Sequence, residues 1–140
     1  MLFRSQTLTF TNTYSAQGNA VLKVKKELNG AGWPSGKSIT FTLTAADGTP
    51  LPDGCSASAS CTVRLSEAGT FSFPAISYSL SDATKTYTYT ITEDLTGFGG
   101  GWSAAQNPVT VQVKVGADTG TGILTVTGTP EDLTDRKSVV

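Results

Sequence analysis

The sequence contains no histidine and few charged residues, and both shortages limit what the protein can do. Without imidazole, neither a Ser-His-Asp or Cys-His nucleophile nor a histidine metal site can be built. Only 15% of the 140 residues are charged, and 10 Lys and Arg against 11 Asp and Glu leave a formal net charge of -1. Such a chain has no electrostatic attraction for a phosphate backbone or an anionic membrane. We therefore expect no enzyme with turnover, no metal, no cofactor and no nucleic-acid partner.

Long apolar runs are also missing. No run approaches the ~20 residues that a membrane-spanning helix needs, and no signal peptide is visible. The hydrophobic content of 38% nevertheless suits the packed core of one domain. We expect no membrane insertion within this stretch of chain.

Both ends of the chain resemble translated sequencing adapter. Residues 1–5 include Leu2-Phe3-Arg4-Ser5, and residues 135–140 read Asp-Arg-Lys-Ser-Val-Val. We expect both segments to be artefacts, with a natural sequence that runs from about Gln6 to Thr134. This stretch would then come from a longer protein, so the absence of a leader or an anchor says nothing about its compartment.

Apolar and polar residues alternate along most of the chain, as is typical of half-buried strands. Turns rich in Gly, Pro, Asn and Asp separate these segments. The alternation is clearest at residues 8–14, 22–26, 39–43, 71–73, 87–91, 109–115 and 124–126. About seven short strands and no amphipathic helical stripe predict an all-β sandwich of mainly antiparallel strands.

The first strand-like segment stands apart from the rest of the pattern. Residues 6–14 read as the last strand of a preceding repeat, and residues 15–19 read as a flexible linker. We expect a domain to start after them and assign residues 20–134 to one repeat. By symmetry this repeat should end with a strand of its own that lies beyond Thr134, and we expect it to lack that final strand.

Three polar residues continue the apolar rows that should face the core. Lys26 follows Leu22 and Val24, Glu93 follows Tyr89 and Ile91, and Asn12 follows Leu8 and Phe10. A buried lysine or carboxylate is costly unless it is paired. Taken singly, each has an ordinary explanation, because a charged side chain at a strand end usually reaches the solvent.

Together these residues lie in segments that resemble the streptococcal-type pilin isopeptide linkage domain. The segments are Leu22–Gly30, Ile39–Thr44, Gly69–Pro74, Tyr87–Glu93 and Phe10–Tyr14. The resemblance implies an immunoglobulin-like (CnaB-type) β-sandwich with Greek-key connections, found in the shaft of a Gram-positive pilus or surface adhesin. It also implies that Lys26 bonds covalently to an asparagine of a last strand, that Asn12 is such an asparagine, and that a buried Glu93 assists.

The chemistry explains why these three residue types are needed. Desolvation favours the neutral forms of a lysine and of a carboxyl group, so the amine can attack and the acid can hydrogen-bond the amide oxygen. Folding supplies the proximity, and the bond forms once per molecule. We expect a structural repeat at the cell surface, anchored to the cell wall. Its expected partners are neighbouring repeats of the same chain and sortase-linked pilin subunits.

The partner of Asn12 has two alternatives. If the first and last strands are parallel neighbours, a short crossover from Asn12 back to Lys26 is disfavoured. Asn12 would then bond to a lysine of the upstream repeat, and Lys26 to a downstream asparagine. Alternatively, residues 7–14 fill the empty place beside the first strand of this repeat, because truncation leaves that edge unpaired.

Two further pairs of residues carry lesser hypotheses. Cys55 and Cys61 have a spacing that suits a small loop-closing disulfide in an oxidising compartment, with two free thiols as the alternative. Trp33 and Trp102 stand beside Pro- and Gly-rich turns. They either cap the ends of the sandwich or form the binding loops of an immunoglobulin-like adhesive or carbohydrate-binding module, which is the alternative function.

Overall fold

The protein is all-β, as the alternation predicts. The computed structural model describes residues 6–56, 61–104 and 107–129 and the backbone of residues 133–139. Within these residues the only helical element is one 3-10 turn, η1 (Leu80–Asp82), and no helix is long and apolar enough to cross a membrane. The strands of the described part are β1 (Gln17–Ala20), β2 (Lys23–Asn29), β3 (Ile39–Ala45), β4 (Cys61–Leu65), β5 (Gly69–Ser72), β6 (Ile76–Ser79), β7 (Thr86–Asp94), β8 (Trp102–Ala104), β9 (Val109–Val115), β10 (Val126–Thr129) and β11 (Leu133–Val139).

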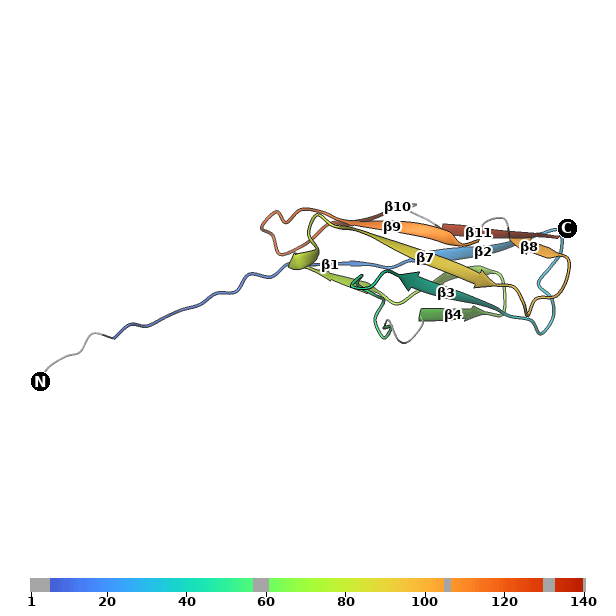
Figure 1. Cartoon of the computed structure of the whole chain (residues 1–140), viewed down its shortest axis with the longest axis horizontal. Helices are drawn as coiled ribbons and strands as arrows, with labels where there is room; N and C mark the ends of the chain where they lie inside the picture. Colours follow the sequence, from blue (N-terminus) through green and yellow to red (C-terminus); the bar gives the residue numbers. More distant parts are fainter. Residues whose placement is uncertain (1–5, 57–60, 105–106, 130–132, 140) are drawn as a thin grey trace, which may run out of the picture.

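The strands form two main sheets that pack as a sandwich, elongated along the strand direction (Figure 1). One sheet has the order β10-β9-β7-β3-β4 and the other the order β5-β2-β11-β8, while β1 and β6 make a separate pair. Every pairing is antiparallel except that of β2 with β11. The sandwich of mainly antiparallel strands is therefore confirmed, and its Greek-key connectivity stays a prediction.

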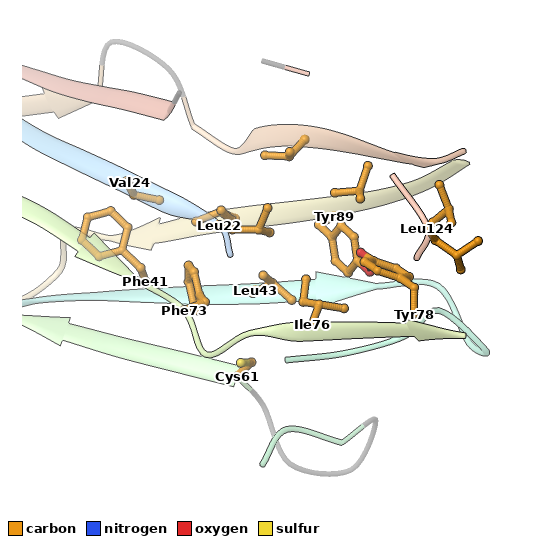
Figure 2. Packing of buried hydrophobic residues seen from close by; sticks show 14 of the residues in the cluster. Leu22, Val24, Phe41, Leu43, Cys61, Phe73, Ile76, Tyr78, Tyr89 and Leu124 are labelled. Atoms are coloured by element: carbon orange, nitrogen blue, oxygen red, sulfur yellow. The ribbon is translucent and has the colours of Figure 1, made fainter. Parts of the chain in front are cut away.

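The core lies between the two sheets and is built from the inner faces of alternating strands. Leu22 and Val24 enter it from one side, and Phe41 and Leu43 of β3 enter it from the other (Figure 2). The intervening Lys23 and Lys25 of β2 are exposed, so the period of two places one half of each strand in the core. Removal of these apolar side chains from water is the main term that stabilises the sandwich.

The first long strand and the last strand of the domain lie side by side. β11 pairs with β2 in parallel over six residue pairs, from Leu133 opposite Val24 to Ser138 opposite Asn29. From the sequence we expect this chain to lack a final strand. In the structure residues 133–139 form that strand, in the position next to β2. β2 pairs with β5 on its other side, so without β11 its remaining edge would offer unpaired backbone groups to any extended segment within reach.

The segment before the sandwich also differs from the prediction. Residues 6–14 form no strand; the chain before Tyr14 runs away from the sandwich as an extended, exposed tail (Figure 1). A strand needs a neighbour for its backbone hydrogen bonds, and the place beside β2 is taken by β11. The predicted linker over residues 15–19 is not free either, because Gln17–Ala20 form β1 and pair with β6.

Candidate functional site

Lys26 reaches the interior because it continues the inner row of β2. Leu22, Val24 and Lys26 are all buried, and Lys26 is only 1% exposed. The alternation that sends Lys23 and Lys25 to the solvent leaves no other direction for this side chain. The charged end of Lys26 therefore lies between the two sheets.

Glu93 enters the same space from the opposite sheet. It continues the row of Tyr89 and Ile91 on β7 and is 5% exposed. β7 is a central strand, between β3 and β9, and Glu93 stands opposite Phe41 in the β3–β7 ladder. A carboxylate at this position is far from solvent and can be tolerated only with a partner.

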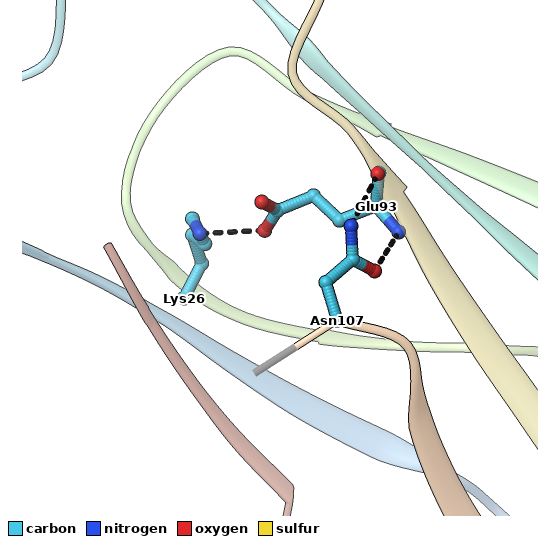
Figure 3. Close-up of polar contacts among 3 residues, drawn as sticks. All are labelled: Lys26, Glu93 and Asn107. Atoms are coloured by element: carbon cyan, nitrogen blue, oxygen red, sulfur yellow. Dashed lines mark hydrogen bonds and ion pairs between the residues drawn. The ribbon is translucent and has the colours of Figure 1, made fainter. Parts of the chain in front are cut away.

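Lys26 and Glu93 meet across the sandwich. The Nζ atom of Lys26 lies 2.6 Å from Oε2 of Glu93, a short charge-assisted hydrogen bond (Figure 3). Their side chains are 0% and 2% exposed. Desolvation of two charges roughly cancels their attraction, so such a pair adds little net stability, yet loss of one partner is strongly destabilising. A costly pair of this kind is a candidate for chemistry rather than for stability.

A cluster of phenylalanine rings lies next to the lysine end of the pair. The Nζ atom of Lys26 lies 5.9 Å from the centre of the Phe41 ring. Phe41 in turn packs on Phe71, at 4.7 Å between ring centres, and Phe71 packs on Phe73 at 5.8 Å. Low polarity around the pair strengthens each electrostatic interaction inside it and disfavours separated charges.

Asn107 fixes the backbone at Glu93 and has no counterpart in the predicted site. The amide N–H of Glu93 donates to Oδ1 of Asn107, and Nδ2 of Asn107 donates to the Glu93 carbonyl, both at 3.0 Å. The β7–β9 ladder ends at Ile91 opposite Val109, so the side chain of Asn107 takes the place of a strand neighbour. Figure 3 shows its amide at the backbone of Glu93, while the carboxylate of Glu93 points to Lys26. Only the fold brings Asn107 there; no sequence pattern indicates it.

The predicted acceptor Asn12 is not brought to this pair. It lies in the exposed tail of residues 6–14, so the alternative in which this segment fills the place beside β2 does not occur in this structure. That place is taken by β11, whose Asp135 stands in register with Lys26. The expectation that Asn12 serves an upstream lysine stays a prediction.

The two cysteines and the two tryptophans lie outside this site. Cys55 and Cys61 form a disulfide, and a ring of this size is worth about 2 kcal/mol. Trp33 and Trp102 are half-buried and both pack on Phe98, at 4.9 and 5.2 Å between ring centres. The indole N–H of Trp33 donates to the Lys37 carbonyl at 2.9 Å. These contacts favour a role in closing the end of the sandwich over a sugar-binding role.

The remaining acidic groups do not assemble into a metal centre. In the part of the chain that the structure describes, no three His, Cys, Asp or Glu residues gather as ligands. The pair of Lys26 and Glu93 is therefore the site that the geometry singles out.

Comparison with known proteins agrees with this geometry. No curated protein matches the sequence. Residues 22–137 match the family FctA, described as the Spy0128-like isopeptide containing domain. The match begins at the start of the inner row of β2 and covers both halves of the buried pair. The chain belongs to the family of Spy0128-like isopeptide-containing domains, which makes it a structural domain of the pilin type.

Proposed function

We propose that this domain is a repeat of a cell-surface pilin or adhesin stalk, stiffened by an isopeptide bond that forms without an enzyme. The observation that carries the proposal is the dry contact of Lys26 with Glu93, beside a parallel last strand. Lys26 is the nucleophile, Glu93 the acid-base group, and an asparagine of the final strand the acceptor. Neighbouring repeats, sortase-linked subunits and a location at the cell wall are the partners and compartment that this function entails.

The reaction can be written with all atoms accounted for. Within the dry pair, a proton passes from the Nζ ammonium of Lys26 to the carboxylate of Glu93, which leaves a neutral amine and a neutral acid. The amine attacks the side-chain amide carbon of the asparagine, and the acid hydrogen-bonds the developing oxyanion. Collapse of the intermediate forms the new C–N bond and releases ammonia, so each bond removes about 17 Da. No substrate is bound and no second turnover follows.

The most direct test completes the last strand. Leu133-Thr134 repeats Leu8-Thr9, after which the upstream copy reads Phe-Thr-Asn-Thr-Tyr. A variant that carries this sequence places an asparagine on the strand beside β2. Its five substitutions are Asp135→Phe, Arg136→Thr, Lys137→Asn, Ser138→Thr and Val139→Tyr.

Intact-mass measurement of the folded variant should show a loss of about 17 Da relative to the sequence mass after allowance for the disulfide. Lys26→Arg or Glu93→Gln in the same variant should abolish this loss. Lys25→Arg and Glu27→Gln are matched controls, because these neighbours on β2 pair with each other at 3.1 Å on the outer face, and they should leave it unchanged. A folded variant of unchanged mass would reject the crosslink and leave a passive spacer domain.

A further inference from the structure

The chain docks onto the sandwich before its first long strand begins. Ala16 is 2% exposed, and Gln17–Ala20 pair residue for residue with β6. The N–H of Gln17 donates to the Gly122 carbonyl at 3.1 Å, and the Gln17 carbonyl accepts from the N–H of Leu124 at 2.9 Å. The segment is therefore held from two sides, by β6 and by residues 122–124.

The backbone of Gly18 approaches residues 124–126 so closely that the sequence itself is adapted to this docking. A Cβ atom placed on Gly18 would lie 2.7 Å from the Leu124 carbonyl oxygen and 2.8 Å from Cγ2 of Val126. Both distances are shorter than real carbon contacts allow, so only glycine fits here. A freely moving linker would have no such requirement.

Tyr14 extends the docked segment to the point where the tail begins. Its hydroxyl donates to Oδ1 of Asp118 at 2.6 Å and accepts from the N–H of Gly122 at 3.1 Å. Asp118 is itself positioned by the Gly120 N–H, which donates to the same oxygen at 3.0 Å. We call residues Asp118–Gly122 the Tyr14 loop, since one side chain from 104 positions away satisfies groups at both of its ends.

On the N-terminal side of Tyr14 the chain leaves the sandwich. Residues 6–13 are exposed, and Leu8 and Phe10 are 77% and 89% accessible although they alternate like the inner face of a strand. Apolar residues with this alternation are typical of a strand whose sheet belongs to another domain. Tyr14 is therefore the point at which the chain changes from an exposed segment that pairs with no sheet of the described structure to a segment held on this sandwich.

We infer that Tyr14 and the Tyr14 loop form a joint that fixes the direction in which the preceding repeat leaves this domain. The partner is the preceding repeat of the same chain, whose last strand would be residues 6–14, so the inference rests on the proposed function. A hydroxyl suits the joint because it donates and accepts at once. The hydrogen bond to Asp118 also raises the pKa of the Tyr14 phenol.

The joint can be tested by NMR on the chain as it stands. In the unaltered chain, we expect the ¹⁵N heteronuclear NOE of Tyr14 and Ser15 to match that of β1, and the Gly122 amide to be protected from hydrogen exchange. Tyr14→Phe removes one oxygen from an exposed ring. It should lower the NOE of both residues to the level of residues 8–10 and speed exchange at Gly122 about 3- to 10-fold, as expected for one hydrogen bond.

Two further variants separate the joint from general loosening. Asp118→Ala should reproduce the effect at Tyr14, while Asp118→Asn keeps an acceptor oxygen and should retain most of the order. Tyr87→Phe is the matched control, since the Tyr87 hydroxyl donates to Asp82 and not to the Tyr14 loop, and it should leave Tyr14 and Gly122 unchanged. Two results would overturn the joint. One is a heteronuclear NOE of Tyr14 in the unaltered chain as low as that of residues 8–10, and the other is an NOE at position 14 that Tyr14→Phe leaves unchanged. Neither result depends on the mass loss, so the crosslink stands or fails separately.

Discussion

At Lys26 the side-chain amine lies between two β-sheets with a carboxylate as its partner and the Phe41 ring beside it. The energetic consequence is asymmetric. The intact pair is close to neutral for stability, whereas a single removed charge leaves the other buried without its counterion. The pair is thus maintained at a cost that a spacer with an apolar core would avoid, which supports a chemical role.

This asymmetry gives the first prediction, for the chain without a crosslink. Glu93→Gln should lower the free energy of unfolding by about 3–5 kcal/mol, because the ammonium of Lys26 loses its counterion. Equilibrium urea unfolding measures the change. Glu27→Gln on the outer face should change stability by less than about 0.5 kcal/mol. The double variant Lys26→Met with Glu93→Leu should recover most of the loss, and a double variant as unstable as Glu93→Gln would contradict the charge argument.

A second prediction concerns the carboxyl group of the joint. The Tyr14 hydroxyl, and after it the Gly120 N–H, donate to Asp118 and lower its pKa below the usual 3.8. A carboxyl group whose pKa is lowered on folding stabilises the contact above 3.8 and loses this effect as the pH falls through the lowered value. The Asp118 carboxyl carbon, followed by NMR, should therefore titrate below pH 3.8 and move toward 3.8 in Tyr14→Phe. Identical titrations in both chains would show that Tyr14 does not act on Asp118.

Lys26 and Glu93 could be predicted from the sequence, whereas Asn107 could not. The first two continue apolar rows with a period of two, and the family resemblance distinguishes them from charged side chains that reach the solvent at a strand end. Asn107 acts through its side-chain amide on the backbone of a residue 14 positions earlier. That contact exists only once β7 and the segment before β9 have come together, so no local rule reports it.

At the scale of elements, β1 shows how a short segment gains structure from its neighbours. It has four residues, two of them Gly18 and Asn19, and its composition favours a turn or a linker. Its order comes instead from β6 and from residues 122–124. The structure has more strands than the seven predicted. The strands β1, β6 and β8 have only three or four residues, a short span for a period of two. β4 does alternate, through Cys61, Val63 and Leu65, and is not among the predicted strands.

The third prediction tests this origin of order. Gly18→Ala should destabilise the domain by about 1–3 kcal/mol, because its Cβ would overlap the backbone oxygen of Leu124, which cannot rotate away. Gly32→Ala is the matched control, since a Cβ there has no neighbour within 4 Å. Thermal unfolding of both variants measures the difference. Equal stability of the two would mean that β1 is only loosely attached.

The final strand β11 shows the limit of reasoning from composition. Residues 135–140, which we expect to derive from adapter sequence, have a composition that indicates no strand, and yet residues 133–139 pair with β2. The strand forms because of its position and not because of its own sequence. The backbone groups at the facing edges of β2 and β8 can pair with an extended chain of varied sequence. The register places Leu133 opposite Val24, and residues 133–134 have the same Leu-Thr sequence as residues 8–9.

At the scale of the whole molecule, the chain enters and leaves at opposite ends of the sandwich. The tail extends from the end that holds β1, and β11 runs toward the other end, parallel to β2 (Figure 1). Tension along the chain therefore acts along the strands. In the proposed function a covalent bond between β2 and the last strand carries this load, so that the strands cannot slide apart, and the joint at Tyr14 passes it from one repeat to the next.

The fourth prediction concerns a chain of two repeats. Because Leu8-Thr9 and Leu133-Thr134 are identical, a chain in which Thr134 continues directly into Phe10 of a second copy has a complete last strand followed by an intact joint. Small-angle X-ray scattering should show an extended, narrowly distributed particle, since each repeat leaves its neighbour in a fixed direction. Tyr14→Phe at the junction should lower the radius of gyration and broaden the distance distribution, because a released junction samples bent arrangements. Tyr87→Phe in both repeats should leave the scattering as it was. Identical scattering curves for the unaltered and the Tyr14→Phe junctions would show that Tyr14 does not set the direction between the repeats. This result is independent of the crosslink, which the intact mass of the same chain reports as the loss of one ammonia from the first repeat.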